Sequence, residues 1–379
     1  MDDRDTIGAA YLAHLTEADL RELAHAAEVS AAQADARIQA LRRAPGLLLD
    51  ILDRPAVSAR LLNLTSADPA QRFALISPFL TFAAAIHRIA ADLRASGYAP
   101  ERTTPRLRVP VFDGPQLAAY LEEPAHRLFL AELLSSFARS SSGVIVTQTS
   151  RGVRRRRWND LDLDLGRLAM LLGALPEQDR PPVWRRLGDL ALFLTGVFPA
   201  AIERALAGRL DPARLARSTG LAQPPASAAA PAELFEWLGA GWYRLAASHA
   251  SGSAATMLAR TALTAADQQP GDRPGDDPAA SGPGERAAGD RPASDRPISD
   301  SRPASRLAGP DDRAAGDQLR TSGLAVPPWS AVATAMSDAT AAAVLRDNAE
   351  HFHQARRVLN AAADRYLFPV AVDWFTPPA

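Results

Sequence analysis

The stretch that decides the fold is Pro-Pro-Val-Trp-Arg-Arg-Leu-Gly-Asp-Leu-Ala-Leu-Phe-Leu-Thr-Gly-Val-Phe-Pro, at residues 181–199. Its tandem prolines suit the first turn of a helix, where the missing N–H groups cost little. Apolar residues then recur at helical spacing, at Val183, Leu187, Leu190, Leu194 and Val197. Further apolar residues widen this stripe until nearly every side is apolar, namely Ala191, Phe193 and Phe198. The stretch therefore predicts a central core helix that ends before its last proline.

Two glycines and one carboxylate stand out in this expected helix. Gly188 and Gly196 lie eight residues apart, so they share a face and allow another backbone to approach closely. Asp189 is the one carboxylate of the stretch and needs a partner if it is buried. We favour a salt bridge to an arginine in the core, because ion pairs often hold buried carboxylates. The alternative is an enzyme of unknown type, in which burial raises the pKa of Asp189 for acid or base catalysis.

Composition excludes several chemistries. Of the 379 residues, 47% are hydrophobic and 22% are charged, which is typical of a globular protein with a sizeable core. The chain has no cysteine, and all 42 of its basic residues are arginine. Thiol catalysis, disulfides, a P-loop lysine and a lysine Schiff base are therefore excluded. The seven histidines show no metal-ligand spacing, and His87 is expected to be packed or hydrogen-bonded. We expect no metal and no cofactor.

Location and partners are constrained by charge and by hydropathy. The formal net charge is −1, so nucleic acid would have to be bound through a local patch. The N-terminus, Met1–Asp5, is acidic and lacks the pattern of a signal peptide. The longest apolar runs, 74–86 and 190–202, are too short to span a bilayer. We expect a cytoplasmic protein that does not bind membranes.

Helical patterns dominate the rest of the chain, and they predict an all-α, multi-helix globular fold. Apolar spacing, caps and prolines place helices at Thr16–Ala27, Ser30–Leu41, Leu47–Leu52, Val57–Leu64, Pro78–Leu93, Pro115–Leu121, Pro124–Arg139, Leu163–Leu175, Ala200–Leu210 and Leu234–Met257. Prolines between Ala99 and Pro110 predict a loop there. The single convincing β pattern is a small hairpin at about 143–158.

The returning strand of that hairpin carries the candidate binding residues. They are Arg154, Arg155, Arg156, Arg157 and Trp158, with Arg151 at the turn. Arginines that alternate between the faces of a strand can bind phosphates, and an aromatic ring beside them can stack on a base. The alternative is a solvated hairpin whose arginines are neutralised by three downstream carboxylates, Asp160, Asp162 and Asp164.

Composition divides the chain into three parts. Residues 1–266 form the expected helical domain with its hairpin. Residues 267–323 are rich in Asp, Arg, Pro and Gly, with imperfect repeats, and predict a disordered internal linker. In the C-terminal segment, 324–379, we expect one long helix at Ala341–Leu367 whose apolar stripe packs back on the first domain. Its charged residues are expected to form an outer face, namely Arg356, Arg357, Asp364 and Arg365.

Five stretches stand out as distinctive: Phe112–Leu121, Arg154–Leu161, Leu187–Pro199, Leu238–Tyr243 and Ala355–Pro369. They resemble an uncharacterised family of bacterial, mainly actinobacterial, hypothetical proteins. The most specific mark is Gly-Asp-Leu-x-Leu-Phe-x-x-Gly-x-Phe-Pro, which starts at Gly188. The resemblance covers most of the chain apart from the linker. It implies an architecture and transfers no catalytic residue.

These observations favour a partner-binding or scaffold protein without catalytic activity. No H-E-x-x-H, G-x-S-x-G, Walker A or dinucleotide-binding pattern is present. Another protein is the expected partner, and nucleic-acid binding through the Arg-rich hairpin is the first alternative. An enzyme built around Asp189 is the second.

Overall fold

The structure is a computed structural model that describes residues 3–28, 30–66, 75–103, 107–138, 142–149, 152–159, 165–200, 202, 211–225, 230–266 and 338–367. For residues 142–149, 152–159 and 250–266 it describes the backbone alone. The expected linker at 267–323 lies outside the described residues, as does most of the helix expected at Ala200–Leu210. By contacts, residues 1–258 and 319–379 form one compact unit, and residues 259–318 form a second.

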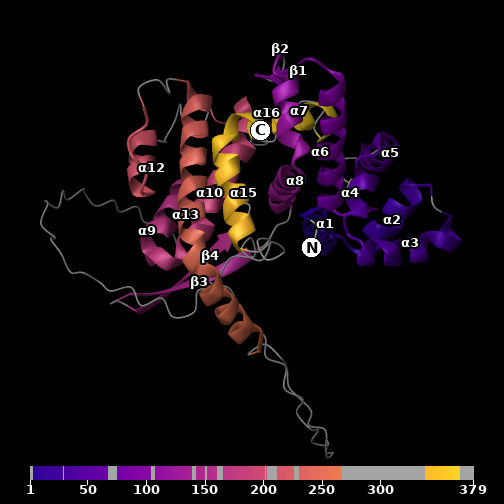
Figure 1. Cartoon of the computed structure of the whole chain (residues 1–379). Helices are drawn as coiled ribbons and strands as arrows, with labels where there is room; N and C mark the ends of the chain where they lie inside the picture. Colours follow the sequence, from indigo (N-terminus) through magenta and orange to yellow (C-terminus); the bar gives the residue numbers. More distant parts are fainter. Residues whose placement is uncertain are drawn as a thin grey trace, which may run out of the picture. The chain divides into compact units, whose positions relative to one another are not determined.

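The all-α fold class is confirmed in the described residues (Figure 1). The α-helices are α1 (Asp3–His14), α2 (Glu17–Ala26), α3 (Ala31–Arg43), α4 (Leu47–Leu52), α5 (Pro55–Ser66), α6 (Pro78–Ala95), α7 (Gly114–Glu122), α8 (Pro124–Ala138), α9 (Leu165–Ala174), α10 (Pro181–Val197), α12 (Pro212–Ser218), α13 (Pro231–Ala266), α15 (Asp338–Glu350) and α16 (Phe352–Ala362). A 3₁₀ turn, η1 (Glu177–Asp179), precedes α10, and a π-helical turn, η3 (Ala363–Leu367), follows α16. The strands are β1 (Ala99–Arg102), β2 (Arg108–Val111), β3 (Ser142–Thr149) and β4 (Gly152–Asn159).

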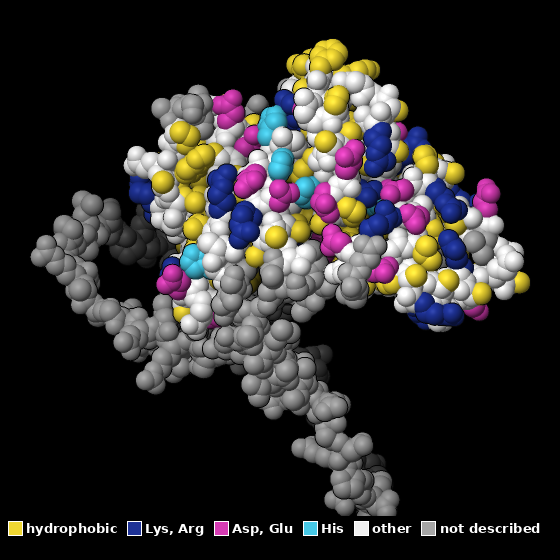
Figure 2. All heavy atoms as spheres, in the orientation of Figure 1, with side chains coloured by type: hydrophobic (Ala, Val, Ile, Leu, Met, Phe, Trp, Pro, Cys, Tyr) yellow, Lys and Arg dark blue, Asp and Glu magenta, His cyan; other side chains and the backbone are white. Residues whose placement is uncertain are grey.

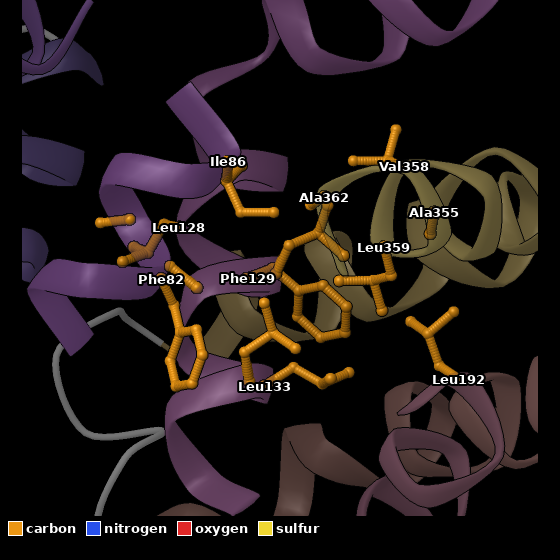
Figure 3. Close-up of a cluster of buried hydrophobic side chains, with 14 of the residues drawn as sticks. Phe82, Ile86, Leu128, Phe129, Leu133, Leu192, Ala355, Val358, Leu359 and Ala362 are labelled. Atoms are coloured by element: carbon orange, nitrogen blue, oxygen red, sulfur yellow. The ribbon is translucent and has the colours of Figure 1, made fainter. Parts of the chain in front are cut away.

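The expected core helix is α10, and the last α-helix among the described residues, α16, packs on it. α16 contacts α10, α6, α7 and β1, so residues from the end of the chain fill the centre of the first unit. Figure 3 shows the shared cluster, which includes Phe82 and Ile86 of α6, Leu128, Phe129 and Leu133 of α8, Leu192 of α10, and Ala355, Val358, Leu359 and Ala362 of α16. Among the described helices, none is both long and apolar enough to cross a membrane.

The two glycines of α10 are close-contact positions, as their spacing predicts. A Cβ built on Gly196 would lie 2.7 Å from Cβ of Leu359 and 3.2 Å from the carbonyl oxygen of Arg356, so α16 lies directly against this residue. A Cβ on Gly188 would lie 2.4 Å from Cε1 of Tyr243. The expectation of an approaching backbone is therefore right for Gly196, whereas at Gly188 the neighbour is an aromatic ring.

The loop expected between Ala99 and Pro110 is wrong, because this segment forms the antiparallel ribbon of β1 and β2. Pro100 lies opposite Pro110 in the register. Opposite residues in an antiparallel pair alternate between those that bond each other and those whose backbone groups point outward. Two residues along, the backbone groups of Arg102 point outward to Asn360. The Pro100–Pro110 pair lies two residues from the Arg102–Arg108 pair, so its backbone groups also point away from the partner strand. The missing N–H groups of the two prolines therefore break no hydrogen bond inside the ribbon.

The single helix expected at Ala341–Leu367 is also wrong in detail, because it breaks at His351. This residue has φ −102° and ψ 25°, and it separates α15 from α16. The carbonyl oxygen of Asp347 accepts both the backbone N–H of His351, at 2.9 Å, and its ring Nδ1, at 3.0 Å. A side chain that competes for a helical carbonyl in this way is a recognised cause of a helix kink.

The charged outer face expected on this helix is wrong as well. Arg356 and Asp364 are each only 6% exposed. They face β1, β2 and α13, which supply their oppositely charged partners. A charge stripe on one helix resembles a solvated face when its partners lie far away in the sequence.

Candidate functional site

The Arg-rich hairpin has the expected strands, β3 and β4. Their register places Arg154 opposite Thr147, Arg155 opposite Val146, Arg156 opposite Ile145, Arg157 opposite Val144 and Trp158 opposite Gly143. The side chains of both strands, together with Arg151, Asp160, Asp162 and Asp164, lie outside the part of the chain whose side chains the structure describes. The four arginines therefore stand in one continuous strand, and the contacts of their side chains stay a prediction.

Asp189 is buried in the core, at 7% exposure, between two partners. The hydroxyl of Tyr243 donates a hydrogen bond to its Oδ1 at 2.9 Å, and Nε of Arg185 lies 3.8 Å from its Oδ2. Burial raises the pKa of Asp189, although the charges of Arg185 and Arg186 and the bond from Tyr243 oppose this effect. Arg185 also lies 3.5 Å from Glu132. The arrangement is that of a carboxylate tied into the core, with tyrosine as its nearest partner.

A second buried polar group surrounds His87. Its Nδ1 lies 2.8 Å from Oδ1 of Asp53, and its Nε2 lies 3.1 Å from the hydroxyl of Tyr11. Burial lowers the pKa of His87 in spite of the bond to Asp53, which favours the neutral ring. Nδ1–H then donates to Asp53, and Nε2 accepts the Tyr11 proton. The expectation of a hydrogen-bonded histidine is confirmed. Tyr11 is 0% exposed, so the group formed by Asp53, His87 and Tyr11 presents no nucleophile to a substrate.

Replacing Asp53 with asparagine should make the free energy of unfolding less dependent on pH in the acid range. Burial alone would raise the pKa of Asp53, but the bond from His87 and the charge of Arg127 lower it to about 2. A folded-state pKa below the ordinary 3.8 adds stability above about pH 4 that is lost as the pH falls toward 2. We expect the parent to lose about 1–2 kcal/mol more than Asp53→Asn between pH 5 and pH 2.5. Denaturant unfolding at several pH values measures this, and parallel profiles would contradict it.

The ribbon of β1 and β2 is fixed to α16 by its backbone and by its side chains. The backbone N–H of Arg102 donates to Oδ1 of Asn360 at 2.7 Å, and the Asn360 amide donates to the Arg102 carbonyl at 3.0 Å. On β2, Nε and Nη2 of Arg108 donate to both oxygens of Asp364, at 2.6 and 2.8 Å. A bidentate pair of this kind sets the orientation as well as the distance.

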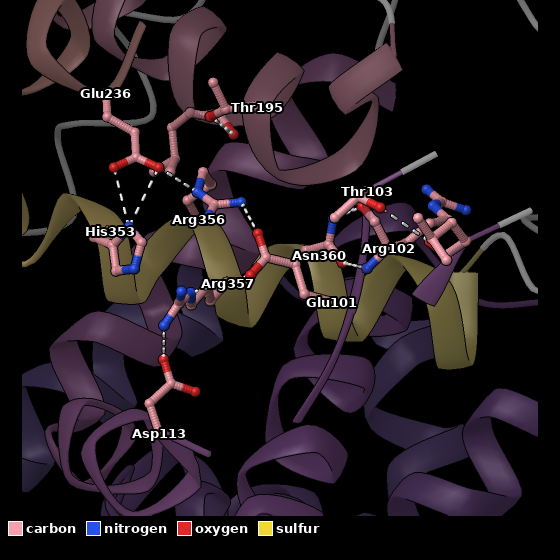
Figure 4. A network of polar contacts seen from close by, with 12 residues as sticks. Glu101, Arg102, Thr103, Asp113, Thr195, Glu236, His353, Arg356, Arg357 and Asn360 are labelled. Carbon is pink, nitrogen blue, oxygen red and sulfur yellow. Dashed lines mark hydrogen bonds and ion pairs between the residues drawn. The ribbon is translucent and has the colours of Figure 1, made fainter. Parts of the chain in front are cut away.

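An ion network around the buried Arg356 extends this attachment (Figure 4). Nη1 of Arg356 lies 2.5 Å from Oε1 of Glu101 on β1, and its Nε lies 2.5 Å from Glu236 on α13. Arg357 reaches Glu101 at 3.2 Å and also bonds Asp113. His353 lies 3.0 Å from Glu236. Burial would raise the pKa of Glu236, yet His353 and Arg356 outweigh it and lower that pKa. The network ties β1, α13 and the start of α7 to one helix.

Exposed apolar side chains gather on this ribbon. Within the described residues, four of the seven exposed large apolar side chains lie between positions 98 and 112: Tyr98 (46%), Leu107 (54%), Val109 (41%) and Phe112 (78%). The rings of Tyr98 and Phe112 are 6.1 Å apart. Figure 2 shows yellow side chains clustered at the top of the view, where Figure 1 places β1 and β2. We call these four residues the ribbon surface.

The outer edge of β2 borders the ribbon surface. No further strand pairs with β2 among the described residues. The backbone groups of Arg108 and Pro110 point away from β1. This edge therefore offers the N–H and carbonyl of Arg108 and the carbonyl of Pro110 to a further strand. Proline on an edge strand removes a donor and limits uncontrolled pairing. The edge is therefore only partly able to accept another strand.

Sequence reasoning missed this ribbon. The signal was the alternation of Leu107, Val109 and Val111, which stand at every second position. Pro110, which lies among these residues, masked this signal, because proline argues against a central strand but is tolerated on an edge.

Comparisons of the chain with models of protein families, with curated protein sequences and with solved structures found no match. Across the described ranges, no group of three or more histidine, aspartate or glutamate side chains is placed to hold a metal ion.

Proposed function

We propose that this protein binds another protein through the ribbon surface and has no catalytic role. One observation carries the proposal: large apolar side chains are concentrated on a short ribbon that ion pairs hold in place, one at the exposed Arg108 and one at the buried Arg356. Single exposed apolar residues are ordinary, but a group of them with an aromatic member marks a contact surface. The family resemblance and a cytoplasmic location are part of this proposal.

The rigid attachment supports binding energetically. A protein that binds another must offset the loss of free motion and the ordering of its own side chains. The ribbon is already ordered by Asn360 and by the Arg108–Asp364 pair, so little further ordering is required. Phe112, as the most exposed member, has the largest apolar area to lose from water. The hydrogen bond from Tyr243 to the buried Asp189 supports a structural role for Asp189 rather than a catalytic one.

Phe112→Ser should abolish most of the binding and leave the fold intact. Aromatic residues at the centre of an interface commonly contribute about 2 kcal/mol or more, so we expect the Kd to rise about 30-fold. Because the side chain is 78% exposed, the free energy of unfolding should change by less than about 0.5 kcal/mol. The partner is first identified by photo-crosslinking from position 112 in the full chain. Its affinity is then measured in purified form.

Met170→Ser is the matched control, because Met170 is 60% exposed on α9 and lies outside the ribbon surface. We expect its Kd to stay within about twofold of the parent value. Equal losses from both substitutions, or none from Phe112→Ser, would contradict the proposal. A crosslink between two copies of this chain would instead identify self-association.

A second candidate function, nucleic-acid binding, is supported by the register of β3 and β4. That register carries Arg154–Arg157 in one strand opposite Val144–Thr147. Changing all four arginines to serine should abolish binding of mixed RNA and DNA at low salt. Affinity of the parent should fall with salt at a log–log slope of about −0.7 to −0.9 per phosphate contact.

The control for this test is the double change Arg42→Ser and Arg43→Ser, which removes exposed charges at the end of α3. It should leave the affinity nearly unchanged. If the parent is not retained by nucleic acid even at low ionic strength, this candidate is wrong. Neutralisation of the arginines by Asp160, Asp162 and Asp164 would then be the better explanation.

A further inference from the structure

The turn between α7 and α8 leaves one helical carbonyl without its usual partner. The carbonyl oxygen of Tyr120 would bond the N–H of residue 124, but that residue is Pro124 and has no N–H. Nδ1 of His126 lies 2.7 Å from this oxygen and takes the place of the missing donor. The imidazole ring stacks on that of Tyr120, with centroids 4.2 Å apart and planes 10° apart. The ring of His126 is thereby fixed at the C-terminal end of α7.

The second nitrogen of His126 meets another acceptor. Nε2 bonds Oδ2 of Asp347, on α15. A neutral imidazole has one N–H, whereas a protonated ring has two. Because a carbonyl oxygen faces one nitrogen and a carboxylate faces the other, both bonds form only when the ring carries the proton. A cation is also favoured at a helix C-terminus, where the last carbonyls point.

One further hydrogen bond joins α15 to this region, and a second histidine lies beside Asp347. The hydroxyl of Tyr120 donates to Oδ1 of Asn348 at 2.6 Å, and Asn348 is 0% exposed. His351 lies 3.2 Å from Oδ1 of Asp347, so this carboxylate stands between two histidines. The side chains of Asp347 and His351 are each 42% exposed, which gives the site access to solvent protons. Figure 2 shows histidine and acidic side chains next to each other in the middle of that view.

Other charged groups on the elements around α8 are engaged elsewhere. Arg127, the next residue on α8, bonds Asp53. On α6, His87 bonds Asp53 and Tyr11, and on α10 Arg185 reaches Glu132. The groups in contact with the His126 ring are Tyr120, Asp347 and His351, while the Glu123 carboxylate accepts from the backbone N–H of Ala125.

We infer that Tyr120, His126, Asp347, Asn348 and His351 form a proton-dependent latch that holds α15 on the turn between α7 and α8. Protonation of His126 favours the docked helix, and loss of the proton breaks one of the two bonds of the ring. Docking should therefore be stronger at low pH than at high pH. Outside this group, Nη2 of Arg244 donates to the carbonyl oxygen of Ala349 on α15 at 3.4 Å. The inference is independent of the ribbon surface.

Hydrogen exchange of the full chain tests the latch. Amide protection of residues 340–350, corrected for the intrinsic effect of pH, should fall about tenfold between pH 5.5 and pH 8.5, which corresponds to one charge-assisted hydrogen bond. His126→Gln should bring the protection of α15 down to the high-pH level at every pH. Protection of α6 should change much less, because its core contacts stay in place.

His25→Gln is the matched control, because His25 is exposed on α2 and its side chain touches Arg60 rather than the latch. It should retain the full pH dependence. If His126→Gln does not fold, Asp347→Asn provides the second test: it keeps an acceptor but removes the charge, so the pH dependence should shrink. Equal protection of the parent at pH 5.5 and pH 8.5, or unchanged pH dependence in Asp347→Asn, would overturn the latch.

Discussion

Arg356→Ala should lower the free energy of unfolding by about 3–5 kcal/mol, the range measured when one partner of a buried ion pair is removed. Arg356 is 6% exposed and lies between Glu101 and Glu236, whose side chains are 15% and 18% exposed. Without the guanidinium, both carboxylates stay in a poorly solvated place with less compensation. Urea unfolding of parent and variant at pH 7 measures the difference.

Arg4→Ala is the matched control for this prediction. Arg4 also forms an ion pair, at 2.6 Å from Asp50, but the two side chains are 47% and 58% exposed. An exposed pair of this kind contributes about 0–1 kcal/mol. A similar small loss from Arg356→Ala would show that α16 does not depend on its ion network.

The pH dependence of Arg356→Ala separates charge from packing. In the parent, the pKa of Glu236 is lowered, so the carboxylate adds stability above its ordinary titration range that is lost as the pH falls. Removing Arg356 removes part of that lowering. The difference between parent and variant should therefore narrow as the pH falls below about 4.5, and a constant difference would point to lost packing alone.

The sequence was sufficient for features that depend on neighbouring residues. The apolar spacing after Pro181 predicts α10, and the β-branched run before Ser150 predicts the hairpin of β3 and β4. Thr16 and Asp19 form the capping box that their spacing suggests. In each case the stabilising contacts lie within a few positions along the chain, where spacing alone reports them.

Features that depend on distant residues could not be predicted. Arg356 looks like part of a solvated face until Glu101, 255 positions away, is placed beside it. In the same way, the bond between Tyr120 and Asn348 joins residues 228 positions apart. The ribbon of β1 and β2 was missed because the tolerance of its prolines depends on which residues pair across the two strands, and the sequence does not contain this information.

The sequence also did not show which group lies against Gly188. A larger side chain at this position should have the second large effect on stability. Gly188→Val should lower the free energy of unfolding by about 3 kcal/mol, at or above the upper end of the usual overpacking range. A Cβ at this position would lie 2.4 Å from Cε1 and 2.5 Å from Cδ1 of Tyr243. The ring cannot retreat freely, because it is 0% exposed and packs against Phe129 and Phe352.

Movement of the Tyr243 ring would also break its hydroxyl bond to Asp189, so steric strain and a lost hydrogen bond add together. Gly173→Ala is the matched control for Gly188→Ala, because a Cβ at Gly173 meets nothing within 4 Å. It should stabilise α9 by up to about 1 kcal/mol, as Ala does in place of Gly in a helix, while Gly188→Ala destabilises.

A double-mutant cycle assigns the cost to the ring itself. In a Tyr243→Leu background, the smaller side chain leaves room, so Gly188→Val should cost at least about 1 kcal/mol less than it does in the parent. Thermal or denaturant unfolding of the four proteins gives this coupling. If the effects of the two substitutions on the free energy of unfolding are additive, Gly188 is not needed to leave room for the Tyr243 ring. The low helix propensity of glycine in the middle of α10 would then lack its structural reason, because within the described part of the chain no other side chain lies as close to this position.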